Sequence, residues 1–586
     1  MSLKPVAAEK PGIPACPEKN APQEARKTPG VRRVLFSWLS PSSREHPPQA
    51  TVRNGTYEGL YTPGFNQDLF LGMPYAQDTG GPNRFRIPQA LNTTWSGART
   101  ATRYSHACPD FTPQDDDLWG MSENCLSINV VRPAGNPRHQ KLPVLFWIHG
   151  GSYQVGTSGL DRYNLSWIVD RSVQIGRPIL AASINYRKGG WGFMHSIEVK
   201  GSGNTNLALR DMRQALAWVQ ENIAAFGGDA SRVTIWGESA GSFAVGQLLM
   251  SYGGRVDGLF HRSIQQSGSA ATAWYNGTAW YQPIYDKIVK QTGCSVAPDT
   301  LACLRTVPYD ILYPLMGTEA DGPVFYPTVD GDILPRYPTD LLHAGRFAHV
   351  PHLYGSNSDE GTDNAPAGTI NTDDDLYNHL LHKSGFNFPE HVVRRIMQLY
   401  PDDPSQGIPL NTGNERFASR GRQFKRAAAI LGDVYYHAPR LDDARHYSRH
   451  NPNGTFIYRF NTRPWVMGKA CGGLGAAYAG VAHATELAFL FGNPSWLGPW
   501  PKYKALSEKV QEMWINFAHD GNPNRPSAAA AATAAQVAWP PYASGGDEGA
   551  NFVLQTEEQG GFYVEPDTYR LAGREFLTEW ARRRHV

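Results

Sequence analysis

The sequence has few charged residues, no long apolar run and no internal repeat. Charged residues make up 18% of the 586-residue chain, and the formal net charge is +2. Because no basic stripe carries interleaved aromatics, nothing indicates a nucleic-acid partner. The mean hydropathy is −0.43, and no apolar run approaches the roughly 18–20 residues that a membrane span requires. We therefore expect a soluble chain without a membrane span that does not bind nucleic acid.

Cysteines are also scarce. The chain has six, without C-x-x-C spacing and without a His/Cys cluster, so we expect no metal and no cofactor. The cysteines that bracket short polar loops are Cys108 with Cys125 and Cys294 with Cys303. This placement indicates local disulfides and an oxidising compartment, and the alternative is four unrelated buried thiols. Cys16 and Cys471 have no evident partner.

Asn-x-Ser/Thr sequons also favour the secretory pathway. These candidate glycosylation sites are Asn54, Asn92, Asn164, Asn276 and Asn453. The N-terminus points the other way, because residues 1–33 are rich in Pro, Lys and Glu and lack the apolar core of a signal peptide. Residues 1–48 are low in apolar content and predict a disordered tail. We expect a secreted type of protein with an irregular N-terminus, and an intracellular location is the alternative.

Two continuous apolar runs, 143–148 and 179–186, are typical of strands buried on both faces of a sheet. Before the apolar strand 233–236, apolar residues recur at spacings of three and four, which predicts an amphipathic helix ending at Phe226-Gly-Gly. These residues are Leu209, Met212, Leu216, Val219 and Ile223. Strands are also predicted at 51–61 and 68–71, and a helix at 506–517. The alternation predicts an α/β fold with a mostly parallel sheet, and one large domain over 49–586.

The most informative segment runs from Val233 to Gly241, where an apolar strand enters a Gly-x-Ser-x-Gly turn and an apolar helix follows. Gly237 and Gly241 allow a sharp turn with a closely packed helix behind it. This geometry lifts Ser239 Oγ off the sheet edge, beside the N-terminus of the next helix. The bare motif arises by chance in many chains, but its strand–turn–helix context predicts a nucleophile elbow.

A nucleophilic serine needs a base, an acid that orients the base, and hydrogen-bond donors for the developing oxyanion. His149-Gly150-Gly151 follows a predicted strand directly. The N–H groups of Gly150 and Gly151 can therefore converge with that of Ala240 on one oxygen. The alternative is an ordinary glycine turn.

The acid and the base should follow the serine in that order along the chain. A loop after the apolar segment 353–354 carries Asp359 and Glu360; composition does not choose between them, and the other is expected to be a solvated loop residue. His483 is the candidate base, because it lies between a Gly-rich segment and the apolar run 487–491. The later histidines expected mostly at the surface are His379, His382, His437, His446 and His519.

Taken together, these motifs resemble the type-B carboxylesterases, the branch of α/β-hydrolases that contains cholinesterases, carboxylesterases and some fungal lipases. The resemblance runs from about residue 48 to the C-terminus. The matching segments are Phe70–Ala76, Ser122–Leu126, His149–Gly151, Ser183–Arg187, Asn222–Asp229, Gly237–Gly241, Gln266–Ser269, Asp359–Gly361, Gly480–His483 and Trp514–Pro523.

The resemblance implies an α/β-hydrolase fold, with a large, mostly parallel twisted sheet flanked by helices and interrupted by long insertions. It implies that Ser239 is the nucleophile, Glu360 the orienting acid and His483 the base. The other roles that it implies are an oxyanion hole of the Gly150, Gly151 and Ala240 amides, supporting polar residues Glu238 and Ser267, and disulfides Cys108–Cys125 and Cys294–Cys303. No cofactor is implied.

The loop between the first two paired cysteines bears on the substrate. In lipases of the family this loop is a longer, apolar flap that opens at an oil surface, whereas here it holds Asp115-Asp-Asp117 beside Leu118 and Trp119. Such a loop has little apolar area to bury, at about 25 cal/mol per Å². We expect a serine ester hydrolase for soluble or short-chain esters, with Trp119 and Trp274 as candidates for pocket lining. The alternatives are a lipase for long-chain acylglycerols and a non-catalytic binding or adhesion protein.

Overall fold

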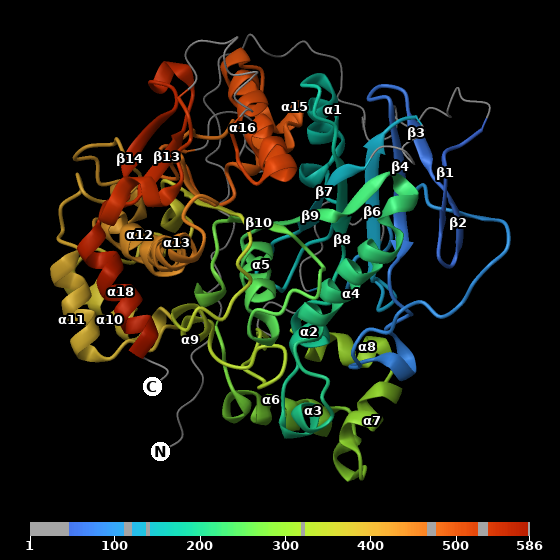
Figure 1. The fold of residues 1–586 in the computed structure, drawn as a ribbon. Helices are drawn as coiled ribbons and strands as arrows, with labels where there is room; N and C mark the ends of the chain where they lie inside the picture. The colour runs from blue at the N-terminus through green and yellow to red at the C-terminus, as the bar shows by residue number, and fades with distance from the viewer. Residues whose placement is uncertain are drawn as a thin grey trace, which may run out of the picture.

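The computed structural model describes residues 46–110, 120–135, 141–272, 274–317, 323–465, 476–524 and 537–583 (Figure 1). Nearly all of the tail expected over 1–48 lies outside these residues. The loop around Asp115–Asp117, Trp119, Cys16 and Cys471 lie outside them as well.

A twisted 11-stranded sheet crosses the molecule in the order β14-β13-β12-β11-β10-β9-β7-β8-β6-β4-β3. Neighbouring strands are parallel from β8 to β13, and the pairs toward both edges are antiparallel. This confirms the predicted α/β-hydrolase fold with a mostly parallel sheet. The strands are β3 (Leu60–Thr62), β4 (Gln67–Pro74), β6 (Ser127–Pro133), β7 (Leu142–Ile148), β8 (Leu180–Ile184), β9 (Gly228–Glu238), β10 (Arg262–Gln266), β11 (His352–Asn357), β12 (Thr455–Phe460), β13 (Ala550–Leu554) and β14 (Tyr563–Pro566).

The strand predicted over 51–61 is divided into three. β1 (Gln49–Val52) and β2 (Gly55–Glu58) form a hairpin, and with β5 (Ala98–Thr100) they make a separate small sheet. β3 then joins the large sheet. The division falls at Gly59, where a Cβ atom would lie 2.5 Å from the Leu69 carbonyl oxygen. The chain changes sheets at a point where only glycine fits.

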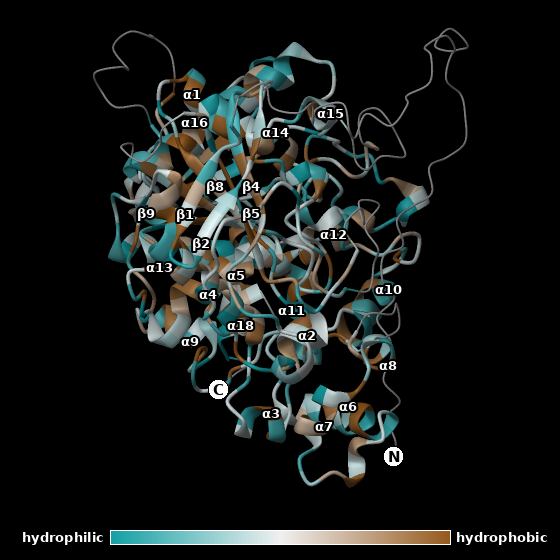
Figure 2. Cartoon of the chain, turned by 90° about the vertical axis from the view of Figure 1, so that its right-hand side faces the viewer, coloured by the Kyte–Doolittle hydropathy of each residue, from teal (hydrophilic) through white to brown (hydrophobic). Residues whose placement is uncertain are grey.

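Strand β7 shows how the sheet separates two hydrophobic cores, because successive side chains point to opposite faces. Phe146 and Ile148 pack with one set of helices, whereas Leu145 and Trp147 pack with the other. The first set includes α4 (Leu207–Asn222), α5 (Ala240–Met250), α6 (Thr278–Gln291) and α7 (Thr300–Thr306). The second set is α1 (Ser166–Gln174), α14 (Leu487–Phe491) and α16 (Pro501–Asp520). In Figure 2 brown residues lie along strands of the large sheet, whereas β2 of the small sheet is mainly white and many helical residues are teal.

Helix α4 confirms the predicted amphipathic helix, and the apolar residues at spacings of three and four are buried. The chain continues as a 3₁₀ turn, Ile223–Phe226, and stops at Gly227, which has a φ of 86°. A left-handed residue of this kind ends helices because glycine adopts it without a steric penalty. The helix predicted at 506–517 is longer than expected, since α16 begins at Pro501.

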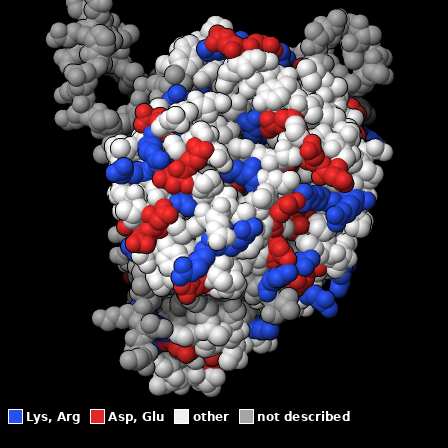
Figure 3. Space-filling model, turned by 90° about the vertical axis from the view of Figure 1, so that its left-hand side faces the viewer, with Lys and Arg blue, Asp and Glu red and all other residues white. Residues whose placement is uncertain are grey.

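A third, largely helical core lies beside the sheet. It contains α10 (Asp373–Asn378), α11 (Glu390–Leu399), α12 (Phe424–Gly432) and the C-terminal helix α18 (Leu571–Arg583). The other helices are α2 (Gly189–Phe193), α3 (Ile197–Gly201), α8 (Tyr309–Leu312), α9 (Pro338–His343), α13 (Ala438–His450) and α15 (Pro494–Leu497). The face shown in Figure 3 carries Lys and Arg interspersed with Asp and Glu.

The structure forms both predicted disulfides. The Cα atoms are 5.0 Å apart in Cys108–Cys125 and 5.7 Å apart in Cys294–Cys303. None of the helices formed by the described residues is both long and apolar enough to cross a lipid bilayer.

Candidate active site

Ser239 lies at the sharp turn between β9 and α5, with φ 56° and ψ −125°. This is an unfavourable conformation for a residue with a side chain, and such strain is common at active sites. The turn also leaves no room for side chains at its two glycines. A Cβ on Gly237 would lie 2.4 Å from the Gly241 oxygen, and a Cβ on Gly241 would lie 2.1 Å from the Ile148 oxygen. The geometry is that of the predicted nucleophile elbow.

Glu360 is fully buried just beyond the end of β11 and binds three donors. Its Oε1 accepts hydrogen bonds from Ser267 Oγ at 2.5 Å and from the Asn357 amide at 2.6 Å. Its Oε2 lies 2.7 Å from His483 Nδ1. The carboxylate therefore fixes the tautomer of His483, with the proton on Nδ1 and the lone pair on Nε2.

The Nε2 atom of His483 faces the elbow. It lies 3.2 Å from Oε1 of Glu238, the residue before Ser239, and it makes no hydrogen bond to a described residue. The Tyr436 ring stacks on the imidazole with centroids 4.6 Å apart, which fixes its plane. The side chain keeps 18% of its surface exposed, so a substrate can reach the imidazole.

Three buried carboxylates surround this imidazole. Burial and the negative charge of Glu486 raise the pKa of Glu238 to about 8, although the charge of His483 opposes the rise. Burial also raises the pKa of Glu486, which accepts hydrogen bonds from Asn357 Nδ2 at 2.6 Å and Gln266 Nε2 at 2.8 Å. Burial alone would lower the pKa of His483, but the charges of Glu360 and Glu238 raise it above its ordinary value. The site thus strengthens His483 as a base.

The three amides predicted to bind an oxyanion lie at the elbow and in the glycine loop that contacts it. A Cβ on Gly150 would lie 3.0 Å from Ser239 Cβ, so the Gly150 backbone is in contact with the elbow. Gly151 has a φ of 107°, and Ala240 is the first residue of α5, where the amide has no partner within the helix. None of the three amides donates a hydrogen bond to another described residue. They are available to an incoming oxygen.

His149, beside these glycines, is buried and neutral. Its Nδ1 donates to the Gly150 oxygen at 2.8 Å, and its ring stacks on Tyr186 with centroids 4.4 Å apart. Burial, together with the charge of Lys188, lowers the pKa of His149 to about 3. His149 therefore shapes the glycine loop without carrying a charge.

Asp359 corrects an expectation, because it is not a solvated loop residue. It is 2% exposed, and its two carboxylate oxygens accept hydrogen bonds from the amides of Leu410 at 2.8 Å and Val481 at 2.7 Å. Gly480 must be glycine here, since a Cβ would lie 2.3 Å from Asp359 Oδ2. Asp359 therefore positions the segment that carries His483. The sequence, in which two acidic residues are adjacent in a loop, does not indicate that Asp359 has this positioning role.

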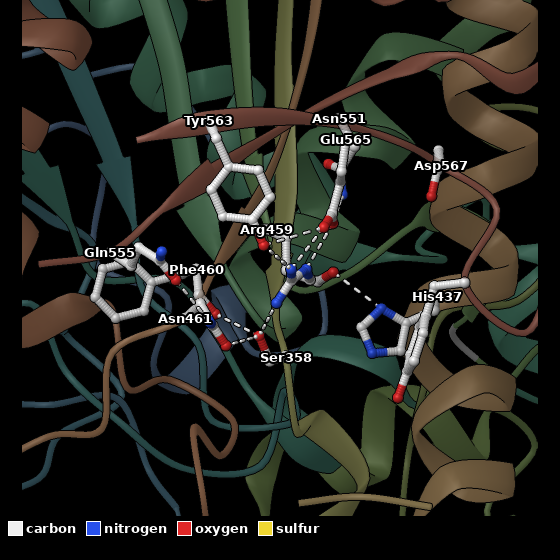
Figure 4. A network of polar contacts seen from close by, with 12 residues as sticks. Ser358, His437, Arg459, Phe460, Asn461, Asn551, Gln555, Tyr563, Glu565 and Asp567 are labelled. Carbon is white, nitrogen blue, oxygen red and sulfur yellow. Dashed lines mark hydrogen bonds and ion pairs between the residues drawn. The ribbon is translucent and has the colours of Figure 1, made fainter. Parts of the chain in front are cut away.

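Ser358 anchors the same loop from the other side, as Figure 4 shows. Its Oγ accepts a hydrogen bond from Arg459 Nη1 at 2.7 Å and lies 2.7 Å from Asn461 Oδ1. Arg459 in turn binds both oxygens of Glu565 at 2.8 Å. The end of β11, and with it Glu360, is tied to β12 and β14.

His437 is a second correction among the histidines expected at the surface. It is buried, with Nδ1 3.1 Å from Ser356 Oγ (Figure 4). Burial and the charge of Arg570 lower its pKa well below the ordinary value, so it stays neutral. The polar sequence around it faces other parts of the fold rather than water. His382 is exposed as expected, and His379, His446 and His519 are partly exposed.

Trp274 lines a cavity of about 660 Å³ together with Phe386, Phe576 and Trp580. Its ring also contacts Tyr435, at 6.2 Å between centroids. Tyr435 precedes Tyr436, which stacks on His483. The residues that line this cavity do not include Ser239, Glu360 or His483.

The sequon asparagines differ in their surroundings. Asn54 is buried, and its Nδ2 donates to the Thr93 oxygen at 2.8 Å, so the folded chain does not present it for glycosylation. Asn92 and Asn453 are exposed, and Asn164 and Asn276 are partly exposed.

Comparison with known proteins gives one consistent family. Residues 46–568 match the sequence profile of the Carboxylesterase family. Lipase 4 of Diutina rugosa is 34% identical over 90% of this chain and 95% of that protein. Secreted lipase 1 of Botryotinia fuckeliana (strain B05.10) is 32% identical over 93% of this chain and 94% of its own length. The crystal structure of Aspergillus niger EstA superposes with a TM-score of 0.76 at 27% identity, covering 91% of this chain and 98% of EstA.

Proposed function

The chain belongs to the carboxylesterase family, and from that premise we propose that it hydrolyses carboxylic esters through an acyl-enzyme formed on Ser239. The observation that carries the proposal is the buried Glu360–His483 pair, which leaves Nε2 without a hydrogen bond beside a strained elbow serine. An ion pair that served stability alone would not require a strained turn beside it.

In the proposed mechanism, Ser239 Oγ attacks the carbonyl carbon while His483 Nε2 takes its proton. The amides of Gly150, Gly151 and Ala240 hold the oxyanion, and such a donor is worth about 10²–10³ in rate. His483 then gives the proton to the leaving alcohol oxygen as the carbon–oxygen bond breaks. Water, deprotonated by the same imidazole, attacks the acyl-enzyme and releases the acid. Throughout these steps Glu360, held by Ser267, stabilises the imidazolium that forms.

Covalent labelling tests this assignment directly. A fluorescent organophosphonate should label the wild-type chain at Ser239. The loss of ester hydrolysis should be proportional to the fraction of chains labelled. The Ser239→Ala variant should take no label. A folded chain that neither labels nor turns over p-nitrophenyl esters would instead support the non-catalytic binding protein.

For the substrate, we propose a soluble or short-chain ester, because the 109–124 loop carries three adjacent aspartates. The second candidate is a lipase acting on long-chain acylglycerols. It is favoured by the relatives named above, and by a Secreted triacylglycerol lipase LIP1 of Gibberella zeae that is 32% identical over 83% of this chain.

A p-nitrophenyl series from acetate to palmitate separates these two candidates. The short-chain proposal expects the highest kcat/KM at short acyl chains and no rise in activity when tributyrin exceeds its solubility limit. A long-chain optimum, together with such a rise, would favour the lipase. Both results leave the role of Ser239 unchanged.

We also propose that residues 49–586 form one catalytic domain that enters the secretory pathway. Two disulfides and four sequons with exposed or partly exposed asparagines support secretion, as do relatives named as secreted lipases. Expression in a secreting host followed by peptide mapping for glycans tests this. Glycans are expected at Asn92 and Asn453 and not at Asn54.

A further inference from the structure

Two histidines and one aspartate meet where α9 packs against α13. His343 is the last residue of α9, and Asp442 and His446 are one turn apart on α13. His343 Nε2 lies 2.9 Å from Asp442 Oδ2, and His446 Nδ1 lies 3.3 Å from Asp442 Oδ1. All three ligand atoms lie within 4.8 Å of one another. None of these residues belongs to the proposed active site.

The two nitrogen–oxygen separations are close to those between ligands of one metal ion. Zinc bonds to nitrogen and oxygen are about 2.0–2.2 Å long, so two ligands of a tetrahedral ion lie about 3–3.5 Å apart. The imidazole rings of His343 and His446 lie against each other with centroids 4.2 Å apart and are tilted by 46°. Two imidazoles with one carboxylate favour zinc over calcium or magnesium, which prefer oxygen ligands.

Burial and access are also suitable. Asp442 is 7% exposed, whereas 26% of the His343 side-chain surface remains exposed, so an ion can enter from solvent.

We propose that His343 Nε2, Asp442 and His446 Nδ1 bind a divalent transition metal ion, for which Zn²⁺ is the best match. The ion takes the place of the proton between His343 Nε2 and Asp442 Oδ2, and of the His446 Nδ1 proton, which now lies toward the Asp442 main-chain oxygen at 2.9 Å. Each neutral imidazole then carries its proton on the opposite ring nitrogen. Three protein ligands leave the fourth position of a tetrahedral zinc ion to water.

Arg449, as it lies in this structure, disfavours metal binding by His446. Its Nη1 donates to His446 Nε2 at 3.5 Å, which favours the tautomer with the proton on Nδ1. When zinc binds Nδ1, the proton moves to Nε2 and this hydrogen bond is lost. The exposed Arg449 side chain must therefore turn away, and its removal should strengthen zinc binding.

The metal would join α9 to α13, the helix that follows the 433–437 segment carrying Tyr436. A ligand that binds only the folded chain stabilises it by mass action. We therefore expect zinc to raise the melting temperature of the full chain without a requirement for catalysis.

The experiment uses the full chain after treatment with a chelator, titrated with ZnCl₂ by isothermal calorimetry and followed by thermal unfolding. The variants are His343→Gln, which keeps a polar donor beside Asp442, and His446→Ala. The matched control is His349→Ala, because His349 is an exposed histidine that stacks on His450 at 4.3 Å, next to this site. Thermal unfolding in chelator shows that each variant is folded.

We expect one zinc ion per chain and a zinc-dependent rise in melting temperature for the wild type and for His349→Ala. Affinity should fall by more than about 10-fold in His343→Gln and His446→Ala, and rise in Arg449→Ala. Ester hydrolysis should not change in His343→Gln. Absence of zinc uptake by the wild type, or equal affinity in the wild type and His343→Gln, would overturn the proposal.

Discussion

Replacing Glu238 by glutamine should shift the pH dependence of hydrolysis toward acid. The Glu238 carboxylate lies 3.2 Å from His483 Nε2 and raises the pKa of that imidazole. His483 acts as a base only when it is neutral, so activity in the wild type should rise with pH through a value above about 6.5. Without the Glu238 charge the imidazole loses its proton at lower pH, and the acid limb of the profile moves down.

The size of the shift follows from the distance. At an effective dielectric constant of about 20, unit charges 3.2 Å apart interact by about 5 kcal/mol. Since about 1.4 kcal/mol corresponds to one pKa unit, the upper limit is about four units. Glu238 has a pKa of about 8 and is itself protonated over part of the range, which reduces its effect. We therefore expect the acid limb of the profile to move by about one to two pH units, which is less than the limit set by Coulomb's law.

The assay is kcat/KM for a short-chain p-nitrophenyl ester between about pH 5 and pH 10, which covers both the ordinary and the raised values. Glu221→Gln is the matched control, since it removes the same charge from an exposed pair with Arg53. A profile that stays unchanged in Glu238→Gln, or moves toward alkali, would refute the electrostatic reasoning. A change only in the plateau value of kcat/KM, without a shift along the pH axis, would not contradict this reasoning.

Three further substitutions test individual contacts. Ser239→Ala should lower kcat by about 10⁶-fold with an unchanged melting temperature, and substantial remaining turnover would contradict the nucleophile assignment. Glu360→Gln should lower kcat by about 10⁴-fold, because an amide does not hold the required tautomer of His483; near-normal kcat would count against the orienting role. Gly480→Ala should lower the free energy of unfolding in urea by about 1–3 kcal/mol through the clash with Asp359. Its control is Gly203→Ala, which has a similar positive φ but no atom within 4 Å of the added Cβ; equal losses would refute the clash.

The sequence predicted the features that depend on neighbouring residues. The strand, Gly-x-Ser-x-Gly turn and helix around Ser239 lie in one continuous segment, and the positive φ of Ser239 and the close contact between Gly237 and Gly241 follow from that segment. The amphipathic helix α4 and the buried strands β7 and β8 likewise follow from the spacing of apolar residues. Both disulfides were predicted because each closes a short loop.

Only the tertiary structure decided which polar side chains meet. Asp359 and Glu360 are adjacent in the sequence, yet Glu360 binds His483 while Asp359 binds the amides of Leu410 and Val481. His437 lies in polar sequence but is buried. The His343–Asp442 contact joins residues 99 positions apart. Local sequence patterns determine which apolar residues are buried, but the partner of a buried polar or charged side chain depends on how distant segments pack.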